Sequence, residues 1–136
     1  MEIIDKYVVD THALIWHLVG DSRLGNNAEK VFQNPDSVLI LPMIALAEAI
    51  DVVQKGRTKI PSVKSLLLDT FSDSRIEIEP LTIEILQESL NAMNVPEMHD
   101  RLITSTALLI EKQGFNVALL TKDSSIIDSK LVQIVW

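Results

Sequence analysis

The sequence predicts a three-layer α/β/α sandwich with a central parallel sheet, folded as one domain over residues 1–136. Short apolar segments alternate with helical segments along the chain, which is the order that builds a parallel sheet. Most of these short segments are apolar at every position, as expected of strands covered by helices on both faces. No linker, repeat or low-complexity run divides the 136 residues, which is the length of one domain.

The first half of the chain is expected to hold two strands and four helices. In order, these are a strand at 6–9, helices at 11–19 and 23–33, a strand at 38–41, and helices at 42–54 and 62–71. Ser22 is placed to cap the second helix. The segment Asn34-Pro35-Asp36 has the composition of a turn. Pro42 in the first turn and Gly56 just past the end delimit the third helix.

The second half is expected to alternate in the same way. The elements are a strand at 76–78, a helix at 82–93, the longest helix at 98–112, a strand at 117–120, a short turn of helix, and a strand at 132–135. The helix at 82–93 has apolar residues at helical spacing, namely Ile83, Leu86, Leu90 and Met93. The helix at 62–71 has more apolar side chains than one face needs, so it is either well buried or part of an interface.

Composition limits the function classes. The chain has 12 basic and 19 acidic residues, a net charge of −7, which argues against a passive nucleic-acid binder. It has no cysteine, hence no disulfide, thiolate metal site or cysteine nucleophile, and this suits a reducing cytoplasm. Residues 1–6 lack the features of a signal peptide, and no apolar run is long enough to cross a bilayer. We therefore expect a soluble, cytoplasmic protein without membrane contact.

Four carboxylates are placed where this fold would bring them together. Asp10 and Asp123 follow the strands at 6–9 and 117–120, and Glu48 and Asp100 belong to helices. The ligand crevice of an open parallel sheet lies outside the carboxyl ends of its strands. If the two strands pair, Asp10 and Asp123 lie side by side in that crevice. Carboxylates this concentrated repel one another unless cations neutralise them, and Mg²⁺ or Mn²⁺ suits such oxygen ligands best.

Each acid also has a structural explanation when it is taken alone. Asp10 can cap the helix at 11–19, and Asp123 can be a turn residue or the cap of the short helix beyond it. Asp100 is an ordinary acid for the first turn of a helix. Glu48 is harder to explain, because its neighbours are apolar and an ionised carboxylate among them needs a partner.

The four acids lie in four short segments. These are Val8-Val9-Asp10-Thr11-His12-Ala13-Leu14, Leu46-Ala47-Glu48-Ala49-Ile50, His99-Asp100-Arg101-Leu102-Ile103, and Leu120-Thr121-Lys122-Asp123. In this order the segments resemble the motifs of the PIN-domain nucleases, and more closely those of VapC-like toxin ribonucleases of type II toxin–antitoxin pairs. The resemblance covers the whole chain. It departs from the family at Pro96-Glu97-Met98-His99, where many toxins have an Asp-Pro-Phe run, and at Pro42-Met43-Ile44, where many relatives have Ser or Thr.

This resemblance implies a ribonuclease that depends on Mg²⁺ or Mn²⁺ and cleaves RNA internally. Asp10, Glu48, Asp100 and Asp123 would be the metal ligands, directly or through water. It also implies a homodimer and a cognate antitoxin. Two alternatives within the fold stay open: an RNA-processing nuclease that is not a toxin, and a silent interaction module.

Other residue types suggest weaker assignments. Thr11 and Thr121 could orient carboxylates by hydrogen bonds. A phosphatase with Asp10 as nucleophile would place a second Asp where the chain has His12. For the remaining candidates, packing, exposure to solvent or an ion pair is at least as good an explanation as a function. These candidates are His12, His17, His99, Arg101, Trp16 and Trp136. Basic residues cluster at Lys55, Arg57 and Lys59.

Overall fold

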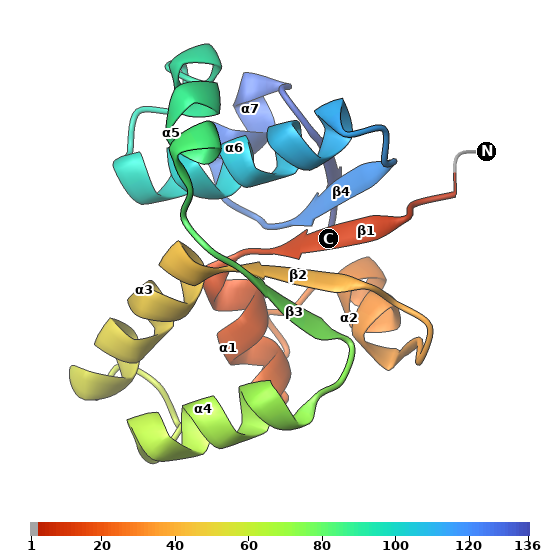
Figure 1. Ribbon diagram of the computed structural model, residues 1–136. Helices are drawn as coiled ribbons and strands as arrows, with labels where there is room; N and C mark the ends of the chain where they lie inside the picture. The colour runs from red at the N-terminus through yellow and green to blue at the C-terminus, as the bar shows by residue number, and fades with distance from the viewer. Residues whose placement is uncertain (1–2) are drawn as a thin grey trace.

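The computed structural model describes residues 3–136, and its centre is a five-stranded parallel sheet with the strand order β3-β2-β1-β4-β5 (Figure 1). The strands are β1 (Lys6–Val9), β2 (Leu39–Pro42), β3 (Ile76–Glu79), β4 (Val117–Leu120) and β5 (Gln133–Val135). Met1 and Glu2, from the N-terminal segment considered above, lie outside the described residues. β2 and β4 are buried at every position, as the apolar runs predicted.

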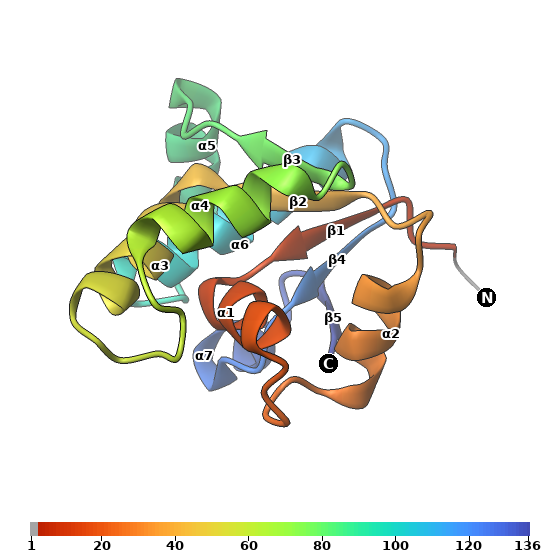
Figure 2. The ribbon, with the colours of Figure 1, turned by 90° about the horizontal axis from the view of Figure 1, so that it is seen from below.

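Helices cover both faces of the sheet. They are α1 (Thr11–Val19), α2 (Asn26–Gln33), α3 (Met43–Gln54), α4 (Val63–Ser72), α5 (Ile83–Glu88), the 3-10 helix η1 (Ser89–Asn91), α6 (Met98–Lys112) and α7 (Ser124–Ser129). Figures 1 and 2 show α1 to α4 on one face and α5 to α7 on the other, so the predicted three-layer α/β/α fold is confirmed. Among residues 3–136, no helix combines the length and the apolar character needed to cross a membrane.

The pairing of β1 with β4 places the carboxyl ends of two strands together. The register runs from Lys6 opposite Val117 to Val9 opposite Leu120, so the two strands end at the same level. The Asp10 N–H continues the ladder by donating to the Leu120 carbonyl at 3.2 Å. The pairing predicted from the sequence is therefore confirmed.

Helix α2 begins three residues later than predicted. The expected helix at 23–33 with Ser22 as its cap is wrong, because α2 starts at Asn26 and its N-cap is Gly25. Leu24 is buried in the preceding loop instead of starting the helix. A Cβ at Gly25 would overlap the backbone and indole of Trp136, so close packing of the last residue requires glycine here. Likewise, Pro42 ends β2 and caps α3, whereas the sequence placed it in the first helical turn.

The predicted helix at 82–93 is interrupted, and its apolar stripe faces outward. α5 ends at Glu88 and continues as one 3-10 turn. All four residues of the stripe are exposed: Ile83, Leu86, Leu90 and Met93. The buried side is formed by Ile85 and Glu88, and Glu88 is paired with Lys112 of α6 at 2.7 Å. Helical spacing identified the helix correctly, but it could not show that the apolar stripe points away from the core of the monomer.

Helix α4 divides its apolar residues between the core and the surface. Leu66 is fully buried, whereas Leu68 and Phe71 are 60% and 61% exposed. The helix predicted at 62–71 is therefore not wholly buried in the monomer.

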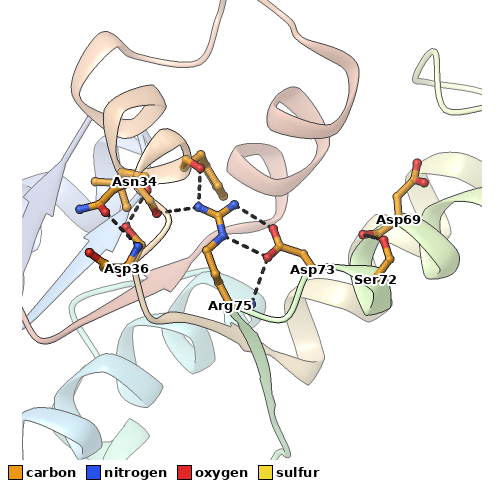
Figure 3. A network of polar contacts seen from close by, with 9 residues as sticks. Asn34, Asp36, Asp69, Ser72, Asp73 and Arg75 are labelled. Atoms are coloured by element: carbon orange, nitrogen blue, oxygen red, sulfur yellow. Dashed lines mark hydrogen bonds and ion pairs between the residues drawn. The ribbon is translucent and has the colours of Figure 1, made fainter.

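Arg75, just before β3, ties the start of this strand to the end of α2 (Figure 3). Its guanidinium donates to the carbonyls of Phe32 and Asn34, and it forms an ion pair with Asp73 at 2.9 Å. Asp73 also accepts from the Arg75 backbone N–H. Because the side chains of both ionic partners are only about one-fifth exposed, at 19% and 21%, this contact is well shielded from water.

Candidate active site

The four predicted acids line one cavity of about 610 Å³ at the carboxyl ends of β1 and β4. Asp10 directly follows β1, and Asp123 caps α7 shortly after β4. Glu48 projects from the middle of α3, and Asp100 from the first turn of α6. Four segments that are distant in the sequence thus supply one acidic surface.

Asp10 is the most buried of the four, and both of its oxygens accept hydrogen bonds. The Thr11 N–H donates to Oδ1 at 2.7 Å, and the Thr121 hydroxyl donates to Oδ2 at 2.6 Å. Burial raises the pKa of Asp10, although the two hydrogen bonds oppose that change. The carboxylate is therefore held in one orientation by residues from both strand ends.

Glu48 is oriented by Thr11, which also contacts Asp10. The Thr11 hydroxyl donates to Oε1 at 2.9 Å, so Thr11 fixes Asp10 through its backbone and Glu48 through its side chain. Burial raises the pKa of Glu48, although the hydrogen bond from Thr11 and the nearby His99 oppose that change, so the partner that the sequence called for is polar. Its other oxygen lies 4.0 Å from Nδ1 of His99.

Asp100 is a strongly perturbed carboxyl group of the cavity. Burial, followed by the charges of Asp123, Asp10, Glu97 and Glu48 in that order, raises its pKa to about 7. Burial first, and then the charges of the neighbouring acids, thus disfavour the ionised form of Asp100 in the absence of a cation.

Glu97 is a fifth acid of the cavity, which the sequence analysis missed. It caps α6 by accepting from the Asp100 N–H at 2.8 Å, and its other oxygen contacts Nδ1 of His99 at 2.6 Å. This contact raises the pKa of His99. The available signal was an acid three residues before Asp100, at the N-cap position of the predicted helix.

Asp123 is both a helix cap and part of the cavity. Its Oδ1 accepts from the Ile126 N–H at 3.0 Å and from the Ser125 hydroxyl at 2.6 Å. Its own N–H donates to the Thr121 hydroxyl at 3.0 Å, and that hydroxyl in turn holds Asp10. The structural explanation considered for Asp10 and Asp123, helix capping, is therefore correct, and it coexists with their position in the cavity.

The donors of the cavity fit a hard divalent cation in chemical kind. All five acids offer oxygen ligands, which Mg²⁺ and Mn²⁺ prefer. Within residues 3–136, however, no three acidic or histidine side chains stand at the spacing of a ready-made metal site. The acids would hold an ion through bridging water or after drawing closer together, and the positive charge of the ion would offset their mutual repulsion.

Aromatic residues form the apolar part of the cavity. Trp16 is 6% exposed and packs edge-on against Trp136, with ring centroids 5.8 Å apart. His12 lines the cavity and tilts against Trp16, whereas His17 stacks on Phe32 elsewhere. Trp16 is thus a packing residue, as expected. Arg101, on α6 beside the cavity, donates to backbone carbonyls of residues 95 and 96.

Comparisons with known proteins point to one family. Residues 7–129 match the family model of the PIN domain, which is most of the chain. No curated protein matches the chain in sequence.

Several solved structures share the fold. A toxin–antitoxin complex from Klebsiella pneumoniae matches at 18% identity with a TM-score of 0.64, over 93% of this chain and 95% of that one. VapBC-1 from nontypeable Haemophilus influenzae matches at 20% identity and 0.66, over 94% and 95%. The toxin VapC20 from Mycobacterium tuberculosis, which cleaves the sarcin-ricin loop, matches at 13% identity and 0.63, over 96% and 100%. At these identities the likeness establishes the fold alone.

Proposed function

The chain belongs to the PIN-domain family, and from this membership we propose that it is a divalent-metal-dependent ribonuclease of the cytoplasm that serves as the toxin of a toxin–antitoxin pair. The observation that carries the proposal is the meeting of Asp10, Glu48, Asp100 and Asp123 in one cavity. The raised pKa values of Asp10, Glu48 and Asp100 are those of a site that is stabilised by positive charge.

The protein's part in catalysis is to hold and orient. A bound Mg²⁺ or Mn²⁺ would make a water molecule more acidic and neutralise charge on the phosphate oxygens. Asp10, Glu48, Asp100 and Asp123 would hold that ion. Thr11 and Thr121 keep two of these carboxylates in fixed orientations through hydrogen bonds of 2.6–2.9 Å. No side chain needs to act as a nucleophile.

Removing the metal is expected to abolish RNA cleavage. Without a cation, the cavity presents only negative charge to a phosphodiester, and neither attack nor departure of the leaving oxygen is assisted. Purified protein should cleave single-stranded RNA in Mg²⁺ or Mn²⁺, lose this activity in excess EDTA, and regain it when metal is restored. Cleavage that persists in EDTA after repeated purification would contradict the metal-dependent mechanism.

The toxin role is supported by the solved neighbours, which include a toxin–antitoxin complex and VapBC-1. We propose that an antitoxin silences this chain by placing an amphipathic segment in an apolar groove and a basic side chain in the acidic cavity. Expression of the chain alone should then arrest bacterial growth. Cleavage of RNA without growth arrest would instead indicate an RNA-processing nuclease, and the absence of both would indicate an interaction module.

We also propose that two copies of the chain form a homodimer. Support comes from an exposed apolar surface around α5, the α5 patch, which comprises Leu81, Ile83, Leu86, Leu90, Met93 and Met98. An apolar surface of this kind in a soluble protein is typical of an interaction site.

A single charge in the α5 patch is expected to separate the dimer. Leu90 is 71% exposed, so Leu90→Asp costs the monomer little but places a carboxylate in the proposed interface. Light scattering should show a dimer for the wild type and a monomer for this variant. Ile3→Asp is the matched control, because Ile3 is 80% exposed, precedes β1 and belongs neither to the α5 patch nor to α4. A wild type that stays monomeric at high concentration, or a control that dissociates equally, would contradict this assignment.

A further inference from the structure

A second cavity of about 310 Å³ adjoins the acidic one, and the two share His12 and Trp16 in their walls. The charged residues that line this basic cavity are Arg23, Arg57, Lys59 and Asp21. It therefore has three cations and one anion, in a chain whose net charge is −7. Positive charge is concentrated beside the acids although the protein as a whole is acidic.

Two of these cations are available to a ligand. Arg23 is paired with Asp21 at 2.8 Å, and Lys55, from the same sequence cluster, is paired with Asp51 at 2.7 Å. Arg57 and Lys59 are exposed, and neither makes an ion pair with any residue of the described range 3–136. The basic cluster noted in the sequence is thus divided. Lys55, just after α3, is paired with Asp51, whereas Arg57 and Lys59 line the basic cavity.

Cations also bridge the two cavities. The Lys122 ammonium lies 4.7 Å from the ring centre of Trp16, and the Arg23 guanidinium lies 4.8 Å from it. Lys122 lines the acidic cavity and Arg23 lines the basic one. Trp16 is buried and shared by both walls, so its ring is contacted by one cation of each cavity.

We propose that the basic cavity is a phosphate subsite, in which Arg57 and Lys59 bind a backbone phosphate of single-stranded RNA beyond the scissile bond. This inference rests on the proposed function. An acidic peptide would meet repulsion where the basic cavity opens into the acidic one, whereas an RNA strand can place one phosphate at a metal among the acids and another at these cations. Because Trp16 is too buried to stack on a base, the subsite would contact the backbone and contribute affinity independently of base sequence.

The test uses a double variant, Arg57→Gln with Lys59→Gln. Its KM for single-stranded RNA should rise about tenfold with little change in kcat, and the dependence of log KM on log salt should flatten by about 0.7 for each lost phosphate contact. The matched control, Lys30→Gln with Lys64→Gln, removes the same charge from exposed positions on α2 and α4 that line neither cavity. This control should keep the wild-type KM and salt dependence, and equal melting temperatures would confirm that both variants fold.

A binding measurement separates this inference from the proposed function. Fluorescence anisotropy of a labelled single-stranded RNA analogue with a cleavage-resistant backbone, measured with Mn²⁺, reports affinity independently of cleavage, which is assayed separately on ordinary RNA. If the wild type binds but does not cleave, and only the Arg57/Lys59 variant loses affinity, the nuclease proposal fails and the subsite stands. If both double variants lose affinity equally, or neither does, the subsite is wrong. A variant that keeps its RNA affinity but loses binding to polyglutamate would likewise overturn it and assign the cavity to an acidic protein partner.

Discussion

The Asp100→Asn variant is expected to lose RNA cleavage by about a thousandfold or more, yet to melt at a higher temperature than the wild type in metal-free buffer. Removing one proposed metal ligand should remove several kcal/mol of transition-state stabilisation. Because each 1.36 kcal/mol of barrier changes the rate about tenfold, the cleavage rate falls by several powers of ten. Asparagine has nearly the shape of aspartate but no charge, so it relieves both the burial of a charge and the repulsion that together raise the pKa of Asp100 to about 7. A lower cleavage rate together with a higher melting temperature is what we expect of a site that destabilises the fold when its ion is absent.

The sign of the stability effect follows from the direction of that shift. A carboxyl group whose pKa is higher in the folded state stabilises the fold when protonated, and that contribution is lost as the pH rises through the folded pKa. The metal-free wild type should therefore lose stability between about pH 4 and pH 7, and the variant, which keeps the raised pKa values of Asp10 and Glu48, should lose less. Because Asp100 is only half-buried and solvent screens its charge, we expect about 1 kcal/mol, or a few degrees in Tm.

Melting curves with and without Mn²⁺ complete this test. The wild type should gain stability from the metal, by about 2.7 kcal/mol at a hundred times the Kd, and the variant should gain much less. Asp128→Asn serves as the control, because Asp128 is an exposed acid of α7 that does not line the cavity. A variant that melts below the wild type in EDTA, or still cleaves RNA at a comparable rate, would contradict the assignment of Asp100.

Replacing Arg75 by methionine is expected to destabilise the fold by about 2–3 kcal/mol. The substitution removes charge-assisted hydrogen bonds to the Phe32 and Asn34 carbonyls at the end of α2 and leaves Asp73 without its partner (Figure 3). Chemical denaturation with a common m-value would measure the loss.

Arg23→Met is the matched control for this prediction. Arg23 holds Asp21 through the same three hydrogen bonds, but its side chain is 62% exposed and makes no carbonyl contact among the described residues. Its replacement should leave the stability nearly unchanged. An equal loss in both variants would mean that the carbonyl contacts of Arg75 contribute little.

The Arg75 effect should also depend on pH. The side-chain hydrogen bond from Arg75 lowers the pKa of Asp73, so the stabilisation is present above the unfolded pKa of about 3.9 and is lost as the pH falls through the folded value. The difference between wild type and Arg75→Met should therefore narrow below about pH 4. A difference that stays constant to pH 2 would show that the carboxylate takes no part.

Features that depend on the alternation of apolar and helical segments along the chain were predictable from the sequence. Strands at 6–9 and 117–120 were placed to the residue, because their apolar runs end at Asp10 and at Thr121. Parallel order places their carboxyl ends at one edge of the sheet, and the pairing of the two strands, which the sequence left open, brings Asp10 and Asp123 into one cavity.

Features that depend on contacts between distant residues were not predictable. The start of α2 is set by the packing of Trp136 on Gly25, which are more than a hundred positions apart. The outward direction of the α5 stripe depends on which side of the helix meets α6, and helical periodicity gives no such direction. Glu97 was missed because its backbone contact with Asp100 is a local capping bond, which by itself gives no sign of a cavity.

The hydrogen bond between Thr121 and Asp10 joins residues 111 positions apart, and this separation has a consequence for when activity can arise. Contacts of such long sequence separation form slowly, because the entropy of closing the loop is lost before they are gained. A chain ordered only through α4 would hold Asp10 and Glu48 but lack Asp100 and Asp123. Nuclease activity would thus appear only with the complete sheet, and its recovery during refolding should coincide with the last cooperative step.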